Sequence, residues 1–404
     1  MALRLRLRIH ALPEPVLRVI MLALPVNARG RAACVCRSWR ALLSDVSLWQ
    51  VLDLTTAAAV ARNGLTDTLV RGAVARAAGR LRVITFGDDQ RQGMVELLTD
   101  ALLDYGGEVL EEVNTDDYLS VDDIEALVAA APRLQVLNAN VLGECRELLP
   151  FVRNDAPYGS LRVGVLDAIF GRASAAAEEV ALAAAVAAHE SLKCLRLANV
   201  RHARCLNALV DAATQRRVSW LRIDDSISDA ETVPALARLL QCNSLTKLEV
   251  DCDAFTPEQE ASAPALCAAL RTCRTLTHLE LRLSGPHGVS RRTVTELLDA
   301  VAELPALARL YIWRSVLQDP AAFGRALGAL LRANLPSFRS LCAFSCEIGN
   351  EGVAELLAGL AANTHLRVLD CGDNNLSAAF ERDRLAPALA KLAARRELDA
   401  RALR

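Results

Sequence analysis

Aromatic residues are scarce in this chain of 404 residues, because Phe, Trp and Tyr together make up only 4% of it. Without large rings to fill one deep core, the aliphatic residues and alanines that dominate the composition favour thin, repeated packing layers. The chain is also too long for one ordinary core. We therefore expect two or three domains or an extended array of repeats.

Long apolar runs are missing as well. No stretch of 18 uncharged apolar residues occurs, and even the alanine-rich run 173–188 is interrupted by Glu178 and Glu179, so no membrane span is expected. Residues 1–10 alternate leucine with arginine, which does not form the apolar core of a secretory signal, although an organelle-targeting segment stays an alternative. We expect a cytoplasmic or nuclear protein without a membrane partner.

Signatures of enzymes and metal sites are absent too. The sequence has no P-loop, no G-x-G-x-x-G, no G-x-S-x-G and no H-E-x-x-H. The acidic residues between Asp116 and Asp123 lack the alternating ligands and the glycine of a calcium loop. Six histidines are scattered without a pair at metal-ligand spacing, and 12 cysteines include no C-x-x-C. We expect no catalytic residue, metal ion or cofactor, and reduced cysteines.

Charge is distributed unevenly along the chain. The formal net charge is −2, yet residues 1–52 contain eight arginines against only Glu14 and Asp45. A basic head on an acidic body favours an acidic partner for the head. The basic residues form no stripe with interleaved aromatics, so nucleic acid is not the expected partner.

The most strongly patterned segment is Leu12–Trp49. Pro13 and Pro15 fit only where a helix begins, and the apolar residues that follow recur at helical spacing until Pro25 ends the run. A second helix is expected from Arg29 to Leu43, and a short third turn before Trp49. Three helices in roughly 40 residues bury too little surface to be stable alone, so the segment should pack on its neighbour or bind a partner.

This segment resembles an F-box. The family pattern opens with Leu-Pro, continues with spaced aliphatic residues, and closes with Val-Cys-(Lys/Arg)-x-Trp and a terminal Leu-Trp, all of which are present here. Two positions depart from it: Pro15 stands where an acid is usual, with Glu14 before it, and the usual aliphatic residue near 28–30 is missing.

The resemblance implies a three-helix F-box at residues 10–52 that binds a Skp-type adaptor of a cullin complex. The positions that would contact the adaptor are Leu12, Pro13, Leu17, Ile20, Leu24, Val35 and Trp39. A generic three-helix cap on the rest of the chain is the alternative.

The remainder, residues 53–404, repeats. Segments related to L-x-x-L-x-L start at eleven positions with a mean spacing of about 28 residues, and helical patterns follow them. The starts are Leu81, Leu110, Leu134, Leu161, Leu192, Val218, Leu245, Leu276, Leu307, Phe338 and Leu366. Ser120 with Asp123, and Ser228 with Glu231, have the spacing of a capping box at a helix start.

This periodicity resembles the ribonuclease-inhibitor type of leucine-rich repeat. The resemblance implies an α/β fold in which the F-box is followed by a solenoid of about 10–12 repeats, with a parallel sheet inside and helices outside. After the strands, Cys346 and Asn374 occupy the position that satisfies backbone groups between layers, so we interpret both as structural.

The strand pattern also predicts a binding face. The leucines of each strand point into the core, so the residue between the second and third leucines, and the residue after the third, face the open side. The predicted target-binding residues are Arg196, Arg222, Asp224, Glu249, Asp251, Glu280, Arg282, Tyr311, Trp313 and Asp370. A merely solvated face is the alternative for the charged residues, whereas Tyr311 and Trp313 are typical of interface anchors or of packing on a neighbouring strand.

Together these patterns predict a non-enzymatic substrate-recognition subunit of a cullin-RING ubiquitin ligase, monomeric outside its complex. The F-box would bind the adaptor and the repeats would hold a protein target. A leucine-rich-repeat scaffold or inhibitor without a ligase connection is the alternative, and a repeat-type regulator of GTPases is a third hypothesis.

Overall fold

The computed structural model describes residues 12–24, 26–55, 67–86, 93–153, 161–163, 165–170, 176–226, 228–252, 260–283 and 288–402. The chain divides into two compact units. Unit 1 comprises Met1–Gly143 and Arg153–Leu166, and unit 2 comprises Glu144–Val152 and Asp167–Arg404. No described helix is both long enough and apolar enough to span a membrane.

The described part of unit 1 starts with short helices. They are α1 (Glu14–Ala23), α2 (Val26–Ala32), α3 (Arg37–Leu43) and the 3-10 helix η2 (Val46–Trp49). The first helix and the last turn are as predicted, but the single helix expected from Arg29 to Leu43 is wrong. The chain breaks between α2 and α3, where Cys36 is extended (φ −155°, ψ 169°). The run Cys34–Cys36 consists of residues with low helix propensity, which accounts for the break.

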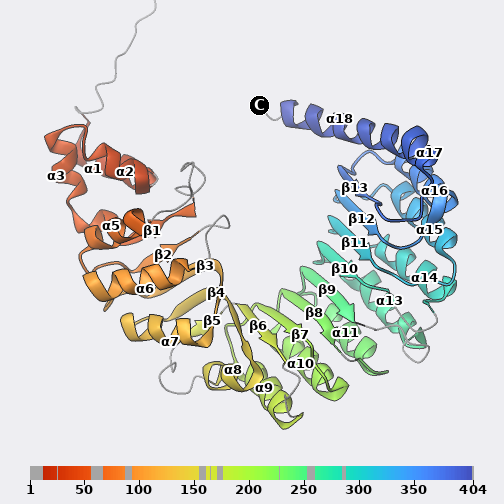
Figure 1. Ribbon diagram of the computed structural model, residues 1–404, viewed down its shortest axis with the longest axis horizontal. Helices are drawn as coiled ribbons and strands as arrows, with labels where there is room; N and C mark the ends of the chain where they lie inside the picture. The colour runs from red at the N-terminus through yellow and green to blue at the C-terminus, as the bar shows by residue number, and fades with distance from the viewer. Residues whose placement is uncertain are drawn as a thin grey trace, which may run out of the picture. The chain divides into compact units, whose positions relative to one another are not determined.

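Strand–helix repeats follow directly in unit 1. The elements are β1 (Val51–Asp53), α5 (Asp67–Ala77), β2 (Val83–Thr85), α6 (Met94–Tyr105), β3 (Glu112–Leu119), α7 (Val121–Ala130), β4 (Val136–Glu144) and β5 (Arg162–Val163). The strands pair in parallel in the order β1-β2-β3-β4-β5, and the helices lie on one side of the sheet (Figure 1). Because β1 comes one residue after η2, the N-terminal helices join the first repeat without a linker.

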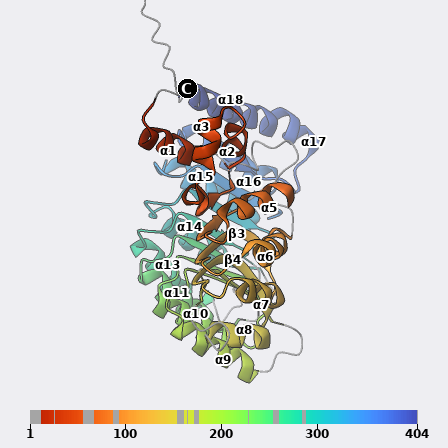
Figure 2. The same ribbon diagram turned by 90° about the vertical axis from the view of Figure 1, so that its left-hand side faces the viewer.

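Unit 2 continues the same alternation. Its elements are α8 (Cys145–Val152), β6 (Val165–Ile169, which begins in unit 1), α9 (Ala176–Ala188), β7 (Cys194–Ala198), α10 (Ala203–Arg216), β8 (Trp220–Ser226), α11 (Thr232–Gln241), β9 (Lys247–Cys252), α13 (Ala263–Thr272), β10 (His278–Leu281), α14 (Arg291–Val301), β11 (Arg309–Trp313), α15 (Pro320–Arg332), β12 (Ser340–Phe344), α16 (Gly349–Ala362), β13 (Val368–Asp370), α17 (Ala378–Phe380), η3 (Glu381–Leu385) and α18 (Ala386–Ala402). Strands β7 to β13 pair in parallel in chain order. The helices α9, α10, α11 and α13 form one row (Figure 2).

One apolar layer per repeat fills the space between strands and helices. All eleven predicted repeat starts lead into a strand, and their first residues are all buried. The parallel register places like residues side by side, as in β10 and β11, where Leu279 is opposite Leu310 and Leu281 is opposite Ile312. The predicted fold class is thus confirmed: parallel strands on one side and helices on the other, after an N-terminal helical segment.

Of the two predicted capping boxes, one forms. Ser120 accepts the Asp123 N–H at 3.2 Å, and Asp123 accepts the Ser120 N–H at 2.8 Å. The second is wrong, because α11 begins only at Thr232. There the Asp229 carboxylate accepts the Glu231 N–H and the Asn207 amide, both at 2.9 Å. A contact with the preceding helix therefore sets the start of α11.

A polar side chain recurs five residues after the inward leucine of several strands. Ser226 accepts the Val200 N–H at 3.1 Å, and Ser315 accepts the Leu283 N–H at 3.0 Å. Asn374 accepts the N–H groups of Cys346 (2.9 Å) and Ile348 (3.3 Å). Each bond joins one repeat to the preceding one in the chain. The predicted structural role of Cys346 and Asn374 is confirmed, because both side chains are buried and hydrogen-bonded.

Glycines bring α15 and α16 into backbone contact. A Cβ on Gly359 would overlap the Gly328 carbonyl oxygen, and one on Gly324 would overlap the backbone of Gly352. No other residue allows helices to approach this closely.

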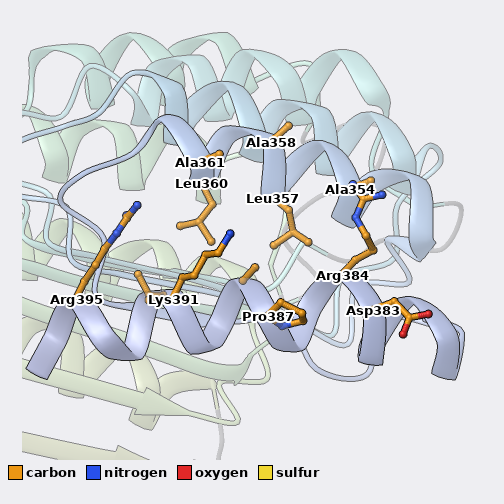
Figure 3. A pocket seen from close by; sticks show the side chains of 12 residues that line it. Ala354, Leu357, Ala358, Leu360, Ala361, Asp383, Arg384, Pro387, Lys391 and Arg395 are labelled. Carbon is orange, nitrogen blue, oxygen red and sulfur yellow. The ribbon is translucent and has the colours of Figure 1, made fainter.

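Helix α18 covers the last repeat. Arg395 donates from Nη1 to the Asn363 carbonyl oxygen at 2.7 Å, and Leu392 is buried. A groove of about 410 Å³ lies between α16 and α18, with Leu357 and Leu360 on one side and Pro387 on the other (Figure 3).

Candidate functional site

Helix α1 is apolar on two faces. Leu17 and Met21, one turn apart, are buried against the rest of unit 1. Val16, Val19 and Leu22 are 43%, 67% and 49% exposed; we call these three residues the α1 patch. Large apolar side chains that are exposed together on one helix are typical of an interaction surface.

The predicted adaptor-binding residues differ in how far their side chains are exposed to solvent. Pro13 and Val35 are exposed, Leu12, Ile20, Leu24 and Trp39 are half-buried, and Leu17 is buried. Leu17 therefore packs in the core of the segment. The residues of the α1 patch were missed, because a pattern of apolar residues does not tell which face the rest of the chain covers.

Arg29 stands where the usual aliphatic residue is missing. Its buried guanidinium donates to three backbone carbonyl oxygens, those of Leu22 (2.7 Å), Leu24 (2.9 Å) and Leu48 (2.7 Å). Burial lowers the pKa of Arg29 below its usual value. These carbonyls belong to the end of α1 and to η2, so one side chain of α2 ties the N-terminal helices together.

Arg29→Met is expected to destabilise the N-terminal helices by about 2–3 kcal/mol, because methionine fills similar space but leaves the buried carbonyls without donors. Urea unfolding followed by tryptophan fluorescence measures the change, since Trp39 and Trp49 lie in this segment. Arg31→Met, at an exposed position of the same helix, is the control and should change stability by less than about 0.5 kcal/mol. Equal midpoints for both variants would show that the Arg29 bonds do not stabilise the segment.

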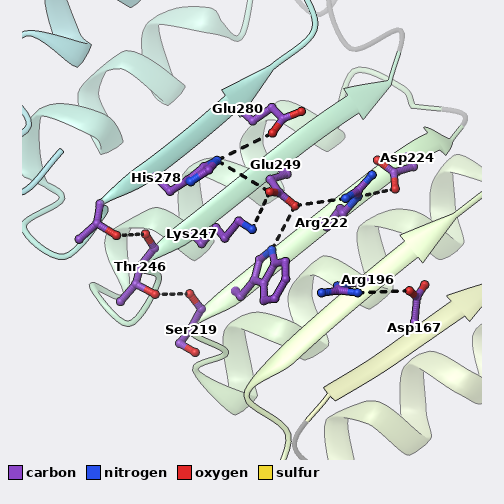
Figure 4. A network of polar contacts seen from close by, with 12 residues as sticks. Asp167, Arg196, Ser219, Arg222, Asp224, Thr246, Lys247, Glu249, His278 and Glu280 are labelled. Carbon is purple, nitrogen blue, oxygen red and sulfur yellow. Dashed lines mark hydrogen bonds and ion pairs between the residues drawn. The ribbon is translucent and has the colours of Figure 1, made fainter. Parts of the chain in front are cut away.

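The second candidate surface is the side of the unit 2 sheet that faces away from the helices; we call it the sheet face (Figure 4). One row across it, set by the strand register, contains Arg196, Arg222, Glu249, Glu280, Tyr311, Cys342 and Asp370. Asp224 and Asp251 are paired in the next row. The alternation is as predicted, because Leu221 and Ile223 point into the core between these residues.

Glu249 lies at the centre of the sheet face. Its side chain is only 8% exposed and accepts hydrogen bonds from Trp220 Nε1 (3.2 Å) and Lys247 Nζ (2.8 Å). Arg222 Nη1 and His278 Nε2 each lie 3.8 Å from a Glu249 oxygen. Trp220, Lys247 and His278 were missed by the sequence analysis. Each of them comes directly before the first inward-pointing residue of its strand, so the two-residue alternation also places it on the open side of the sheet. That alternation is the signal that could have found them.

Aromatic rings of the sheet face stack on neighbouring side chains. The Trp220 ring has Arg196 Cζ 4.2 Å and Lys247 Nζ 3.8 Å from its centroid, in cation–π geometry. Tyr311 stacks on His278 with centroids 5.2 Å apart. Tyr311 thus packs on the adjacent strand, which is the second of the two roles considered for it.

Ion pairs hold the other charges of the sheet face. Arg222 Nε lies 2.6 Å from Asp224 Oδ2, and Arg282 Nη1 lies 2.9 Å from Asp251 Oδ1. Burial raises the pKa of Asp224, and Arg222 opposes this shift. These ion pairs hold the side chains of the sheet face in fixed orientations.

Within the part of the chain that the structure describes, two groups of residues could hold a metal ion, although the sequence predicted none. They are Glu179, His202 and Cys205, and Glu249, His278 and Glu280. In the second group the Lys247 ammonium, 2.8 Å from Glu249, repels an incoming cation. In the first group the signal that was missed is the spacing His202-x-x-Cys205 at a helix start.

Comparison with known proteins bears on the N-terminal segment. Residues 9–55 match the F-box-like family model, a range that includes the predicted 10–52. Comparison with curated proteins finds no match. Among solved structures, the crystal structure of the Rad7 and Elc1 complex in yeast matches over 90% of this chain and 88% of that chain, with 14% identity and a TM-score of 0.43.

The chain combines an F-box-like segment with strand–helix repeats of the leucine-rich type.

Proposed function

We propose that this chain is a substrate-recognition subunit of a cullin-RING ubiquitin ligase. The observation that supports it best is the α1 patch, because an F-box-like segment there keeps Val16, Val19 and Leu22 in solvent. An adaptor of the Skp type would cover these side chains together with the half-buried Ile20. Burial of this apolar surface would supply the affinity.

The sheet face of unit 2 is the proposed target site. Its ion pairs and stacked aromatic rings favour a folded or extended protein segment with complementary charges. Glu249 is the most buried charged side chain of the sheet face. The chain itself would carry out no chemistry. It would raise the local concentration of the target beside a ubiquitin-conjugating enzyme, in the cytoplasm or the nucleus.

A binding titration of the purified full chain with a purified Skp-type adaptor tests this function. We expect a one-to-one complex with a Kd of about 1 µM or lower, which corresponds to about −8 kcal/mol. A second, unlabelled F-box peptide should compete for the adaptor. If no complex forms at tens of micromolar, the ligase assignment is wrong and the scaffold or inhibitor alternative takes its place.

A further inference from the structure

A carboxylate, an imidazole and a thiol meet between α9 and α10 of unit 2. Glu179 lies in the first turn of α9, His202 is the residue just before α10, and Cys205 lies in the first turn of α10. Glu179 Oε2 is 3.0 Å from His202 Nδ1, and one ligand atom of each residue lies within 4.8 Å of the others. The three groups thus converge on one point.

The carboxylate of this cluster is fully buried. The Glu179 side chain has no exposed surface, whereas His202 is 44% exposed. The only backbone donor described for it, the Arg201 N–H, is distant at 3.4 Å. A buried carboxylate needs charge or hydrogen-bond compensation. His202 Nδ1 supplies a hydrogen bond at 3.0 Å, and a bound cation would supply the opposite charge.

Helices α13 and α14 offer a comparison, because a glutamate near the start of α14 is held by hydrogen bonds alone. Glu260 accepts the Ser290 N–H and the Thr293 hydroxyl, both at 2.9 Å. Ser290 is the residue just before α14, and Thr293 follows three residues later, as Cys205 follows His202. A hydroxyl side chain and a backbone N–H therefore suffice to join this half-buried glutamate to the next helix.

At the start of α10, the imidazole of His202 and the thiol of Cys205 occupy the positions that the hydroxyls of Ser290 and Thr293 have at the start of α14. Histidine is a poor helix cap, and among the described residues the His202 side chain makes no capping hydrogen bond. Imidazole and thiol are, however, the preferred ligands of zinc, with carboxylate as a common third. Compared with the start of α14, the start of α10 thus lacks a capping hydroxyl and has two zinc-binding side chains instead.

We propose that Glu179, His202 and Cys205 bind a zinc ion, with water as the fourth ligand on the open side beside His202. Zinc–ligand bonds of about 2.0–2.3 Å place tetrahedral ligand atoms roughly 3–4 Å apart, so small side-chain movements complete the site. Coordination by Sγ releases the thiol proton to solvent. The ion would join α9 to α10 on the helical side, away from the sheet face.

Zinc content of the purified full chain tests the proposal. After incubation with a small excess of zinc chloride and gel filtration, elemental analysis should find about one ion more per chain than in Cys205→Ser. Serine keeps a hydroxyl like that of Thr293, so this variant should fold with an unchanged circular-dichroism spectrum. Cys242→Ser, a half-exposed cysteine at the end of α11, is the matched control and should retain the ion.

Cobalt provides a second measurement on these proteins, and His202→Ala is added to both measurements. The full chain and Cys242→Ser should show thiolate-to-cobalt absorption, which His202→Ala and Cys205→Ser should lose. Equal zinc content and identical cobalt spectra in all four proteins would overturn the proposal. Adaptor binding should be the same with and without zinc, so this result is separate from the test of the ligase function.

Discussion

Replacing both Val16 and Val19 by glutamate is expected to weaken binding of a Skp-type adaptor by at least about 100-fold, or about 2.7 kcal/mol. Both side chains are exposed in the free chain. In the complex, each new carboxylate would lose its hydration inside an apolar interface without a partner. The titration that measures adaptor affinity for the unaltered chain measures this loss.

The controls separate loss of binding from loss of fold. Val180→Glu changes a similarly exposed valine on α9 and should leave adaptor affinity unchanged. Leu17→Ala, on the buried face of α1, should lower the stability of the N-terminal helices by about 2–4 kcal/mol. Adaptor affinity within threefold of the unaltered chain, in a folded Val16→Glu, Val19→Glu protein, would rule out the α1 patch as the docking surface.

Asn374→Ala is expected to destabilise unit 2 by about 3–5 kcal/mol. The buried Asn374 side chain makes five hydrogen bonds: it accepts the N–H groups of Cys346 and Ile348, and donates to the carbonyls of Ala343, Cys371 and Gly372. Alanine would leave these backbone groups unpaired beneath the last repeat. Thermal or urea unfolding followed by circular dichroism measures the change.

Asn350→Ala is the matched control for this prediction. Asn350 also joins two repeats, by bonds to Ser377, but it is exposed, so water replaces the lost partner and the cost should stay below about 1 kcal/mol. Asn374→Ser should recover part of the lost stability, because Ser226 and Ser315 serve at the same position of other repeats. Equal effects of the Asn374→Ala and Asn350→Ala substitutions would show that the buried bonds do not stabilise the repeats.

Local patterns predicted much of the fold, and the two errors have different causes. Prolines at the start of α1 and the period of the leucines depend on neighbouring residues only, so α1 and the strands at the eleven repeat starts were found. The break at Cys36 follows from residues of low helix propensity that the apolar spacing alone does not reveal. The start of α11 at Thr232 depends on a contact with another segment, the bond from Asn207 to Asp229. Propensity is a weak guide where tertiary contacts compete with it.

For the candidate binding surfaces, too, local patterns predicted part of the arrangement and tertiary contacts decided the rest. Two-residue alternation placed Arg222 and Asp224 on the open side of the sheet, but the burial of Glu249 under Trp220 and Lys247 follows from the register of parallel strands. The cluster joins Glu179 of α9 to His202 and Cys205, which follow it by 23 and 26 positions at the start of α10. No spacing rule within one element predicts such a meeting.

For Leu12–Trp49, the sequence alone determined its helical nature and its resemblance to an F-box, because both depend on residue types at fixed spacing. Tertiary structure decided which side of α1 stays in solvent, and that Arg29 takes over the role of the missing aliphatic residue. It likewise brought an acid, a histidine and a cysteine of unit 2 together. The physical reason is that periodicity defines the faces of an element, whereas only packing against the rest of the chain decides which face is covered.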